Sequence, residues 1–241
     1  PNYNKAYMVV ADVARGDGGD YSACHVIDIE ESTQVAEYKG KLDTKDFGNF
    51  LVSLSTEYNQ ALLVIENANI GWAVIQQVID REYKNLFYMS NDLKYVDVEN
   101  QMTNRYRAEE RGMKPGFSTT AKTRPLIVSK LEQYIREKSV TIRSTRTIDE
   151  LFTFIWNGNR AEAMRGYNDD LTMSLSIGLW VRDTALRLRQ EGIDLTKKTL
   201  GGIGQSTEGL VSGFGGNESM DENPWKMKVG NQNEDLTWLI K

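Results

Sequence analysis

Cysteine and histidine are nearly absent from this sequence, which contains one of each, Cys24 and His25, among 241 residues. A single cysteine excludes an internal disulfide and is typical of a reducing compartment. A single histidine excludes two-histidine zinc sites, HNH nucleases and histidine-rich phosphodiesterases. Any hydrolytic chemistry must therefore rely on carboxylates, and on metal ions that prefer oxygen ligands, such as Mg²⁺ or Mn²⁺.

Long apolar runs are absent as well, and no phosphate loop of the Gly-x4-Gly-Lys-Ser/Thr type occurs in the chain. No segment is long enough to span a bilayer, so we expect no membrane partner. Hydrophobic residues make up 40% of the chain and charged residues 26%, which is ordinary for a globular protein with a sizeable core.

The domain organisation follows from where the apolar periodicity stops. We expect one large domain over residues 1–192 and a tail over residues 193–241, because eight glycines fall between Gly201 and Gly230. Within the domain, residues 90–118 are polar and charged for longer than an ordinary connection. This stretch is either a functional loop or hairpin or a disordered excursion.

Charge is distributed unevenly along the chain, although its net value is only −5. Residues 1–100 hold 8 Lys and Arg against 16 Asp and Glu, and residues 147–241 hold 10 against 14. Residues 101–146 reverse this balance with 11 against 4. A basic middle segment is usually a solvated surface, but beside an acidic metal site it is suited to hold a phosphate backbone.

Hydrophobic periodicity predicts an α/β fold with a mixed central sheet flanked by helices. Short connections between the first three strands favour antiparallel pairing. The run ending at Glu66 follows a helix-periodic segment, which predicts a central parallel strand reached by a crossover helix. The predicted strands are 5–13, 21–29, 34–40, 61–66, 86–89 and 140–143. The predicted helices are 44–58, capped by Thr44 or Asp46, then 69–83, 119–138, 148–156 and 170–190.

Acidic residues stand at corresponding ends of the apolar segments. Asp12 and Glu66 each follow a strand, and Asp169-Asp170 open the last helix. Strand ends and helix N-termini converge at one edge of an open sheet. Carboxylates gathered there repel one another unless cations neutralise them. Two divalent ions about 4 Å apart would do so, and would also activate a water and stabilise a leaving oxygen of a phosphodiester.

Each acid also has an explanation without chemistry. Asp169, next to Asn168, is suited to cap a helix, and Glu66 could pair with an arginine. Asp20 follows a glycine turn and could be a turn residue. For each acid alone the structural explanation is stronger, whereas the joint pattern favours a metal site.

The motifs resemble those of a ribonuclease H-like nuclease, and more narrowly the C-terminal nuclease domain of the large terminase subunit of tailed bacteriophages. They occur in that family's order over roughly residues 6–182, and the last is the most specific. The matching pieces are Val10-Ala11-Asp12, Gly18-Gly19-Asp20-Tyr21, Val64-Ile65-Glu66-Asn67, the segment from Gly116 to Pro125, Glu150-Leu151, and the segment from Gly166 to Leu175.

The resemblance implies a role for individual residues. It makes Asp12, Glu66 and Asp170 the catalytic metal ligands, with Asp169 and Asp20 as accessory ligands, for two Mg²⁺ or Mn²⁺ ions. It also places Lys122 and Arg124 near DNA. From the basic character of the middle segment we expect some of its other cations to contact phosphates as well: Arg105, Arg107, Arg111 and Lys114.

The resemblance further implies an endonuclease that cuts double-stranded DNA with little sequence preference during phage genome packaging, in the host cytoplasm. In the full-length protein the partners would be an ATPase domain, the portal and a small terminase subunit. The sequence holds no phosphate loop, so we expect it to represent the nuclease half, monomeric by itself.

Other functions remain open at this point. One is another ribonuclease H-like nuclease, such as a junction resolvase. Another is a DNA-gripping module without catalysis, which the retained carboxylates disfavour. A third is an actin-like ATPase, suggested by residues 12–19, but this needs a second Asp-x-Gly hairpin that the sequence lacks.

Overall fold

The computed structural model describes residues 1–14, 21–68, 70–89, 108, 112–158, 160–183, 185, 186, 190, 194, 226–229 and 232–235. The chain divides into two compact units, Pro1–Gly192 and Ile193–Lys241. In the second unit, β9 (Lys226–Val229) and β10 (Gln232–Asp235) pair as an antiparallel hairpin.

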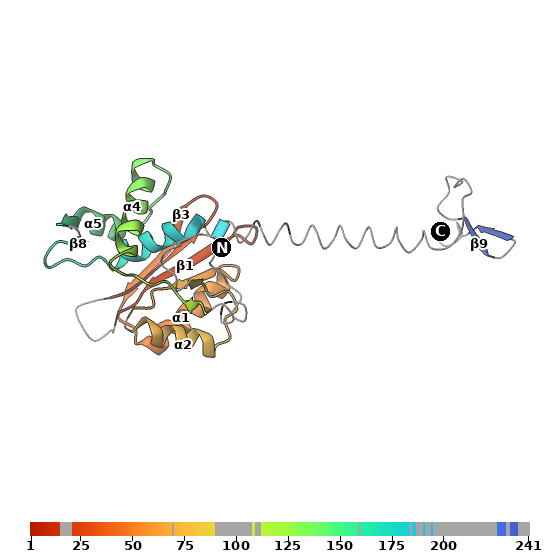
Figure 1. Ribbon diagram of the computed structural model, residues 1–241, viewed down its shortest axis with the longest axis horizontal. Helices are drawn as coiled ribbons and strands as arrows, with labels where there is room; N and C mark the ends of the chain where they lie inside the picture. The colour runs from red at the N-terminus through yellow and green to blue at the C-terminus, as the bar shows by residue number, and fades with distance from the viewer. Residues whose placement is uncertain are drawn as a thin grey trace. The chain divides into compact units, whose positions relative to one another are not determined.

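The first unit is built on a four-stranded mixed sheet in the order β3-β2-β1-β4 (Figure 1). The strands β1 (Tyr7–Asp12), β2 (Ser22–Asp28) and β3 (Thr33–Gly40) are antiparallel neighbours. β4 (Leu62–Ile65) lies parallel to β1 on its other side. The predicted mixed sheet with three antiparallel strands first is therefore confirmed.

Helices α1 (Thr44–Glu57) and α2 (Gly71–Asp80) connect and follow these strands. The N-cap residue of α1 is Asp43, one residue before the earlier of the two predicted caps. The side chain of Asp43, and not that of Thr44 or Asp46, accepts a hydrogen bond from the backbone N–H of Asp46 at 2.8 Å. An aspartate at this position satisfies one of the unpaired N–H groups of the first turn.

Beyond β4 the sheet continues through short pairings. The strand β5 (Tyr88–Met89) pairs with β6 (Lys114–Pro115), and Phe117 bridges to Glu66. The predicted 140–143 strand is reduced to a single bridge between Thr141 and Thr33.

Two predictions for the second half of this unit are wrong. Helix α4 (Thr123–Arg136) starts four residues later than predicted. Its apolar periodicity predicts one common face for Leu126, Ile127, Leu131, Tyr134 and Ile135. Ile127, Leu131 and Tyr134 are buried, whereas Leu126 and Ile135 are 47% and 44% exposed. The predicted 148–156 helix is helix α5 (Thr145–Thr153) followed by strand β7. β7 (Phe154–Asn157) turns back into β8 (Arg160–Ala163), because Gly158 with φ 60° permits a tight hairpin.

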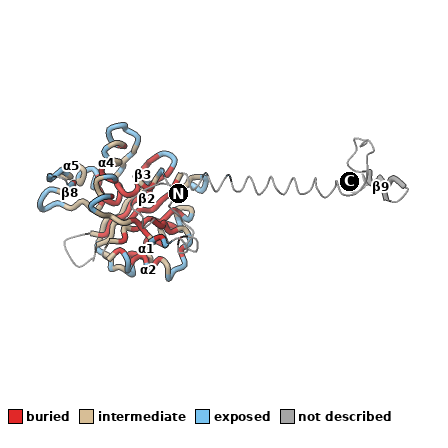
Figure 2. The backbone as a smooth tube through the Cα atoms, in the orientation of Figure 1, coloured by how far each residue is buried: buried red, intermediate tan, exposed pale blue. Residues whose placement is uncertain are grey.

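The sheet is buried on both faces, giving three layers (Figures 1 and 2). On one face, Met8, Val10 and Val64 pack against α4 and the helix over residues 170–183. On the other face, Val9 and Ile65 pack against α1 and α2. Alternate residues of each strand therefore belong to different cores, as the two-residue period of a strand requires. No helix in the described ranges is long and apolar enough to cross a membrane.

The start of α2 lies against the end of β4 so closely that only glycine fits. A Cβ atom on Gly71 would stand 1.8 Å from the carbonyl oxygen of Glu66. We expect Gly71→Ala to destabilise the fold by about 2 kcal/mol or more, measured by urea unfolding, because backbone and not a flexible side chain must move.

Gly48→Ala in α1 is the matched control. Its added Cβ would meet Cγ and Cβ of Gln77 at 2.8 and 2.9 Å and the carbonyl oxygen of Val74 at 3.3 Å, a milder clash than the 1.8 Å approach at Gly71. In addition, alanine in the interior of a helix stabilises the helix by about 1 kcal/mol relative to glycine, which offsets part of the cost in Gly48→Ala. Equal losses of stability in the two variants would contradict the close contact between Gly71 and Glu66.

Candidate metal and nucleic-acid site

The ends of β1 and β4 place two carboxylates side by side. Ala11 is in register with Ile65, and the N–H of Glu66 donates to the carbonyl oxygen of Ala11 at 2.9 Å. By strand alternation, Asp12 shares a face with Val10, and Glu66 shares a face with Val64. Both carboxylates therefore project to the face that carries the 170–183 helix.

The N-terminus of that helix brings two further acids. Asp169 and Asp170 stand at its first turn, where the carbonyl oxygen of Asp169 accepts from the N–H of Met173 at 2.7 Å. Residues 171–179 are all buried, which fixes the helix against the sheet.

A buried hydrogen-bond chain holds this helix start in place. The imidazole Nε2 of His25 lies 2.9 Å from the carbonyl oxygen of Leu171, and its Nδ1 lies 2.8 Å from the Gln34 amide. Since Nε2 must donate and Nδ1 must accept, the ring is neutral. Burial lowers the pKa of His25 to about 4 and keeps it so. His25 is therefore a structural residue that orients the start of the 170–183 helix.

Asp12 is buried among the other carboxylates of the site, and its pKa responds to both burial and their charges. Desolvation by burial, followed by the charge and hydrogen bond of Glu66, raises the pKa of Asp12 well above its usual value. The charges of Asp170 and Asp169 raise it further. Two carboxyl groups this close repel each other when both are charged, so the surroundings of Asp12 favour its protonated form.

A lysine from the edge strand β3 reaches the same place. Lys39 is in register with Ala23, which is in register with Asp12, so Lys39 projects to the same face. Its ammonium contacts Glu150 of α5 and lies 3.2 Å from Asp170. Desolvation acts to lower the pKa of Lys39, but its hydrogen bonds and charge pairing with Glu150 and Asp170 raise it overall.

Glu150 completes this cluster and is held from two sides. Besides contacting Lys39, it accepts a hydrogen bond from the N–H of Thr172 at 3.0 Å, which anchors it to the helix start. Desolvation raises the pKa of Glu150 and also that of Asp170, in spite of the nearby ammonium. The effect of burial on both carboxyl groups thus outweighs that of the nearby ammonium.

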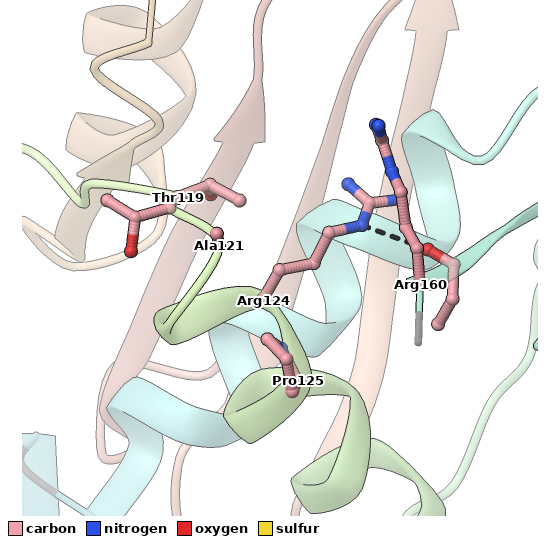
Figure 3. A pocket seen from close by; sticks show the side chains of 7 residues that line it. Thr119, Ala121, Arg124, Pro125 and Arg160 are labelled. Atoms are coloured by element: carbon pink, nitrogen blue, oxygen red, sulfur yellow. Dashed lines mark hydrogen bonds between the residues drawn. The ribbon is translucent and has the colours of Figure 1, made fainter. Parts of the chain in front are cut away.

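Arg124 provides the second cation. Its guanidinium lies 2.5 Å from Asp169 and donates to the carbonyl oxygen of Ala161 at 2.9 Å. It lines a pocket of about 340 Å³ between the start of α4 and β8 (Figure 3). The pocket is lined by Thr119, Thr120, Ala121, Arg124, Pro125, Arg160 and Ala161. Two arginines and two threonines give it donors suited to an anion.

The chemistry of the donor set fits a hard divalent cation. Five carboxylates face two cations here, and Mg²⁺ and Mn²⁺ prefer oxygen ligands. In the described part of the chain, however, no three acidic, histidine or cysteine side chains are arranged to hold a metal ion as they stand. Asp169 and Asp170 are directed to Arg124 and Lys39 instead.

The remaining predicted site residues are less closely placed. Lys122 is the exposed N-cap residue of α4, two residues before Arg124. Lys114 is exposed on β6. The predicted residues Asp20, Arg105, Arg107 and Arg111 lie outside the described residues.

Solved structures with the same arrangement of elements identify the fold. The large terminase nuclease of thermophilic phage G20c with bound magnesium superposes with a TM-score of 0.54 and 17% identity, covering 73% of this chain and 81% of that one. The same nuclease with bound cobalt gives 0.53 and 17%, covering 74% and 82%. No protein-family model matches the sequence. The chain has the fold of a phage large-terminase nuclease domain.

Within this terminase-nuclease fold, sequence reasoning did not assign a role to three residues. Glu150 belongs to one of the quoted motifs but was given no place in the site. Lys39 reaches the site through the register of two hairpins, which places it two strands from Asp12 and which the sequence alone does not fix. Arg160 carries no signal in the sequence, because the predicted helix over 148–156 takes in most of β7 and no strand is predicted for β8.

The crowding of carboxylates around Asp12 has a measurable effect on stability without metal. A folded-state pKa above the unfolded value of 3.8 means that the folded chain binds the proton more tightly. The stability that this tighter proton binding contributes is fully present below the pKa of Asp12 in the unfolded chain. It is lost as the pH rises through the pKa of Asp12 in the folded chain. We therefore expect Asp12→Asn, which stays neutral, to be more stable than the original chain at pH 7 in chelator, by about 1 kcal/mol.

The gain in stability of Asp12→Asn over the original chain should shrink as the pH falls towards the pKa of the Asp12 carboxyl in the unfolded chain. Urea unfolding at each pH would measure this gain. Asp43→Asn is the control, since asparagine caps α1 as well as aspartate does and the charge of Asp43 is not among those that raise the pKa of Asp12. A loss of stability at pH 7 in Asp12→Asn would show that the surrounding residues stabilise the negative charge of Asp12 and would contradict this prediction.

Proposed function

We propose that this protein is a divalent-metal-dependent endonuclease that cuts double-stranded DNA with little sequence preference during phage genome packaging. The observation that supports it most is the Asp12–Glu66 pair, facing the Asp169-Asp170 helix start within a terminase-nuclease fold. The proposal includes an ATPase domain, a portal and a small subunit as partners in the host cytoplasm.

In this proposal Asp12, Glu66 and Asp170 hold Mg²⁺ or Mn²⁺, two ions in all, with Asp169 and Asp20 as accessory ligands. Bound ions would supply an activated water and a stabilised leaving oxygen. The chain's own residues orient the ligands. Glu66 is fixed by the β1–β4 ladder, and Asp170 by the helix start that His25 supports.

DNA is held through its phosphates in this proposal. The pocket between α4 and β8 adjoins the acids through the Arg124–Asp169 pair, so a phosphate bound there would leave its neighbours close to the carboxylates. Lys122, and Lys114, Arg105, Arg107 and Arg111 from the basic segment, would contact further phosphates. Phosphate contacts give affinity without reading sequence, which suits a packaging nuclease.

A junction resolvase and a DNA-gripping module make different predictions for the same chain. A resolvase would cut branched DNA in preference to linear duplex. A gripping module would bind DNA equally well with and without its carboxylates and would cut nothing.

The proposed chemistry is tested by metal removal. With Mg²⁺ or Mn²⁺ the chain should nick and cut plasmid DNA on a gel, and chelator should abolish this. Asp12→Asn, Glu66→Gln and Asp170→Asn should each reduce the rate by at least about a hundredfold while keeping a cooperative unfolding transition.

Asp28→Asn is the matched control, because Asp28 also ends a strand and pairs with a lysine, but at the opposite end of β2. It should keep most of the cleavage rate. Undiminished cutting in chelator, or by Asp12→Asn, would overturn the proposed function.

The pocket is tested with two arginines that resemble each other closely. Arg160 lines the pocket, is 69% exposed and lies 3.4 Å from Glu162. Arg136, at the other end of α4, is 70% exposed and lies 3.4 Å from Glu132. We expect Arg160→Gln to weaken duplex binding equally for unrelated sequences and to lower the salt slope of binding by about 0.9.

Arg136→Gln should leave both quantities unchanged, as fluorescence anisotropy at several salt concentrations would measure. Equal effects of the two substitutions would show that only overall charge matters. A loss confined to one sequence would indicate base recognition.

A further inference from the structure

Lys39 occupies a position that the proposed metal chemistry does not require. It comes from β3, the strand of the sheet farthest from β4, yet its ammonium reaches Asp170 and Glu150. Its side chain is only 15% exposed, and those of Glu150 and Asp170 are 10% and 13% exposed. Such a buried cation is held in place by its partners and is not a solvated surface lysine.

The register explains how Lys39 reaches the acids. The row Lys39, Ala23 and Asp12 crosses three neighbouring strands, and Ala23 in the middle has almost no side chain. The Tyr21 ring lies 5.1 Å from the ammonium and supports it from another side. The ammonium therefore lies next to a carboxylate of the proposed metal site.

The charge balance around Asp170 indicates what Lys39 does there. With its carboxylate at 3.2 Å from the ammonium, Asp170 is directed towards β3. The described residues show no three-carboxylate arrangement that would hold an ion as it stands. The Lys39 ammonium accounts for both the direction of Asp170 and the lack of such an arrangement among the described residues, because it occupies the side of Asp170 that a metal ion would otherwise use.

We propose that Lys39 is a built-in counter-ion that neutralises Asp170 and Glu150 in the metal-free protein and competes with the divalent metal for Asp170. This inference rests on the proposed metal site. For a metal ion to bind Asp170, the Lys39 ammonium would have to move away from Asp170. The ammonium would still be paired with Glu150, which the N–H of Thr172 holds in place. The metal-free site would thus stay folded, and its affinity for a divalent metal would be lowered by the competing ammonium.

Removal of the lysine charge tests the competition. In Lys39→Met we expect the dissociation constant for Mn²⁺ to fall by about tenfold, by calorimetry on the whole 241-residue chain, since one competing charge is gone. The melting temperature without metal should fall, and Mn²⁺ should raise it by more than it does in the original chain. Lys39→Arg, which keeps the charge, should bind Mn²⁺ within about twofold of the original.

Lys5→Met is the matched control, because Lys5 also pairs with two carboxylates, Asp28 and Glu31, away from the site. It should lower the melting temperature and leave Mn²⁺ affinity unchanged. Unchanged or weaker Mn²⁺ binding in Lys39→Met, with the original chain still binding Mn²⁺, would overturn the counter-ion role alone. Failure of the original chain to bind any divalent metal would overturn the proposed function as well.

A second measurement needs no substitution and stands even if Lys39→Met does not fold. An amine-reactive acylating reagent should label Lys39 slowly in chelator and several-fold faster with Mg²⁺, because the ammonium has left Asp170. Lys5 is the internal reference and should react at one rate in both conditions, as peptide mass spectrometry would show. Slower or unchanged labelling of Lys39 with Mg²⁺ would refute the competition.

Discussion

The parallel strands β1 and β4 end side by side, with Asp12 as the last residue of β1 and Glu66 directly after β4, so the two carboxylates lie close together and repel each other. The surrounding structure is arranged to tolerate this repulsion. A helix start brings two more acids, and Lys39 and Arg124 arrive from β3 and α4 to offset part of the charge. The fold thereby keeps an excess of negative charge at one edge of a sheet whose two faces are otherwise apolar.

Hydrophobic cores on both faces stabilise this arrangement. Burial of the β1 and β4 side chains stabilises the sheet by about 1.5–3 kcal/mol for each large apolar residue. Such gains exceed the cost of a few raised carboxyl pKa values, so the strands hold the acids together in spite of their mutual repulsion. A rigid scaffold with a strained polar edge is common where strands carry ligand-binding residues.

The central sheet could be predicted because apolar segments and turn residues specify it locally. Asp12 and Glu66 could be placed for the same reason, since strand ends in parallel register lie together. The inward face of α4 could be predicted only in part, because Ile127, Leu131 and Tyr134 are buried, whereas Leu126 and Ile135 are apolar yet exposed. The β7–β8 hairpin was missed since its residues, including Ile155 and Trp156, suit a helical period as well as a strand.

The contacts of Lys39 and Arg160 depend on tertiary structure, which explains why neither was predicted. Lys39 needs the register of two hairpins, and Arg160 needs the position of β8 against α4. The role of Asp20 and of the basic residues between 105 and 111 stays a prediction, as these positions lie outside the described residues.

The position of β3 at the edge of the four-stranded sheet has a consequence for association between molecules. An edge strand offers unpaired backbone groups to any other strand, and native proteins discourage this with charged side chains that point inward. Glu37 and Lys39 are such residues, with side chains that are 14% and 15% exposed. A strand from a second chain that paired with β3 would have to come close to these charges. Lys39, which offsets part of the acidic cluster, therefore also disfavours the pairing of a second chain with β3.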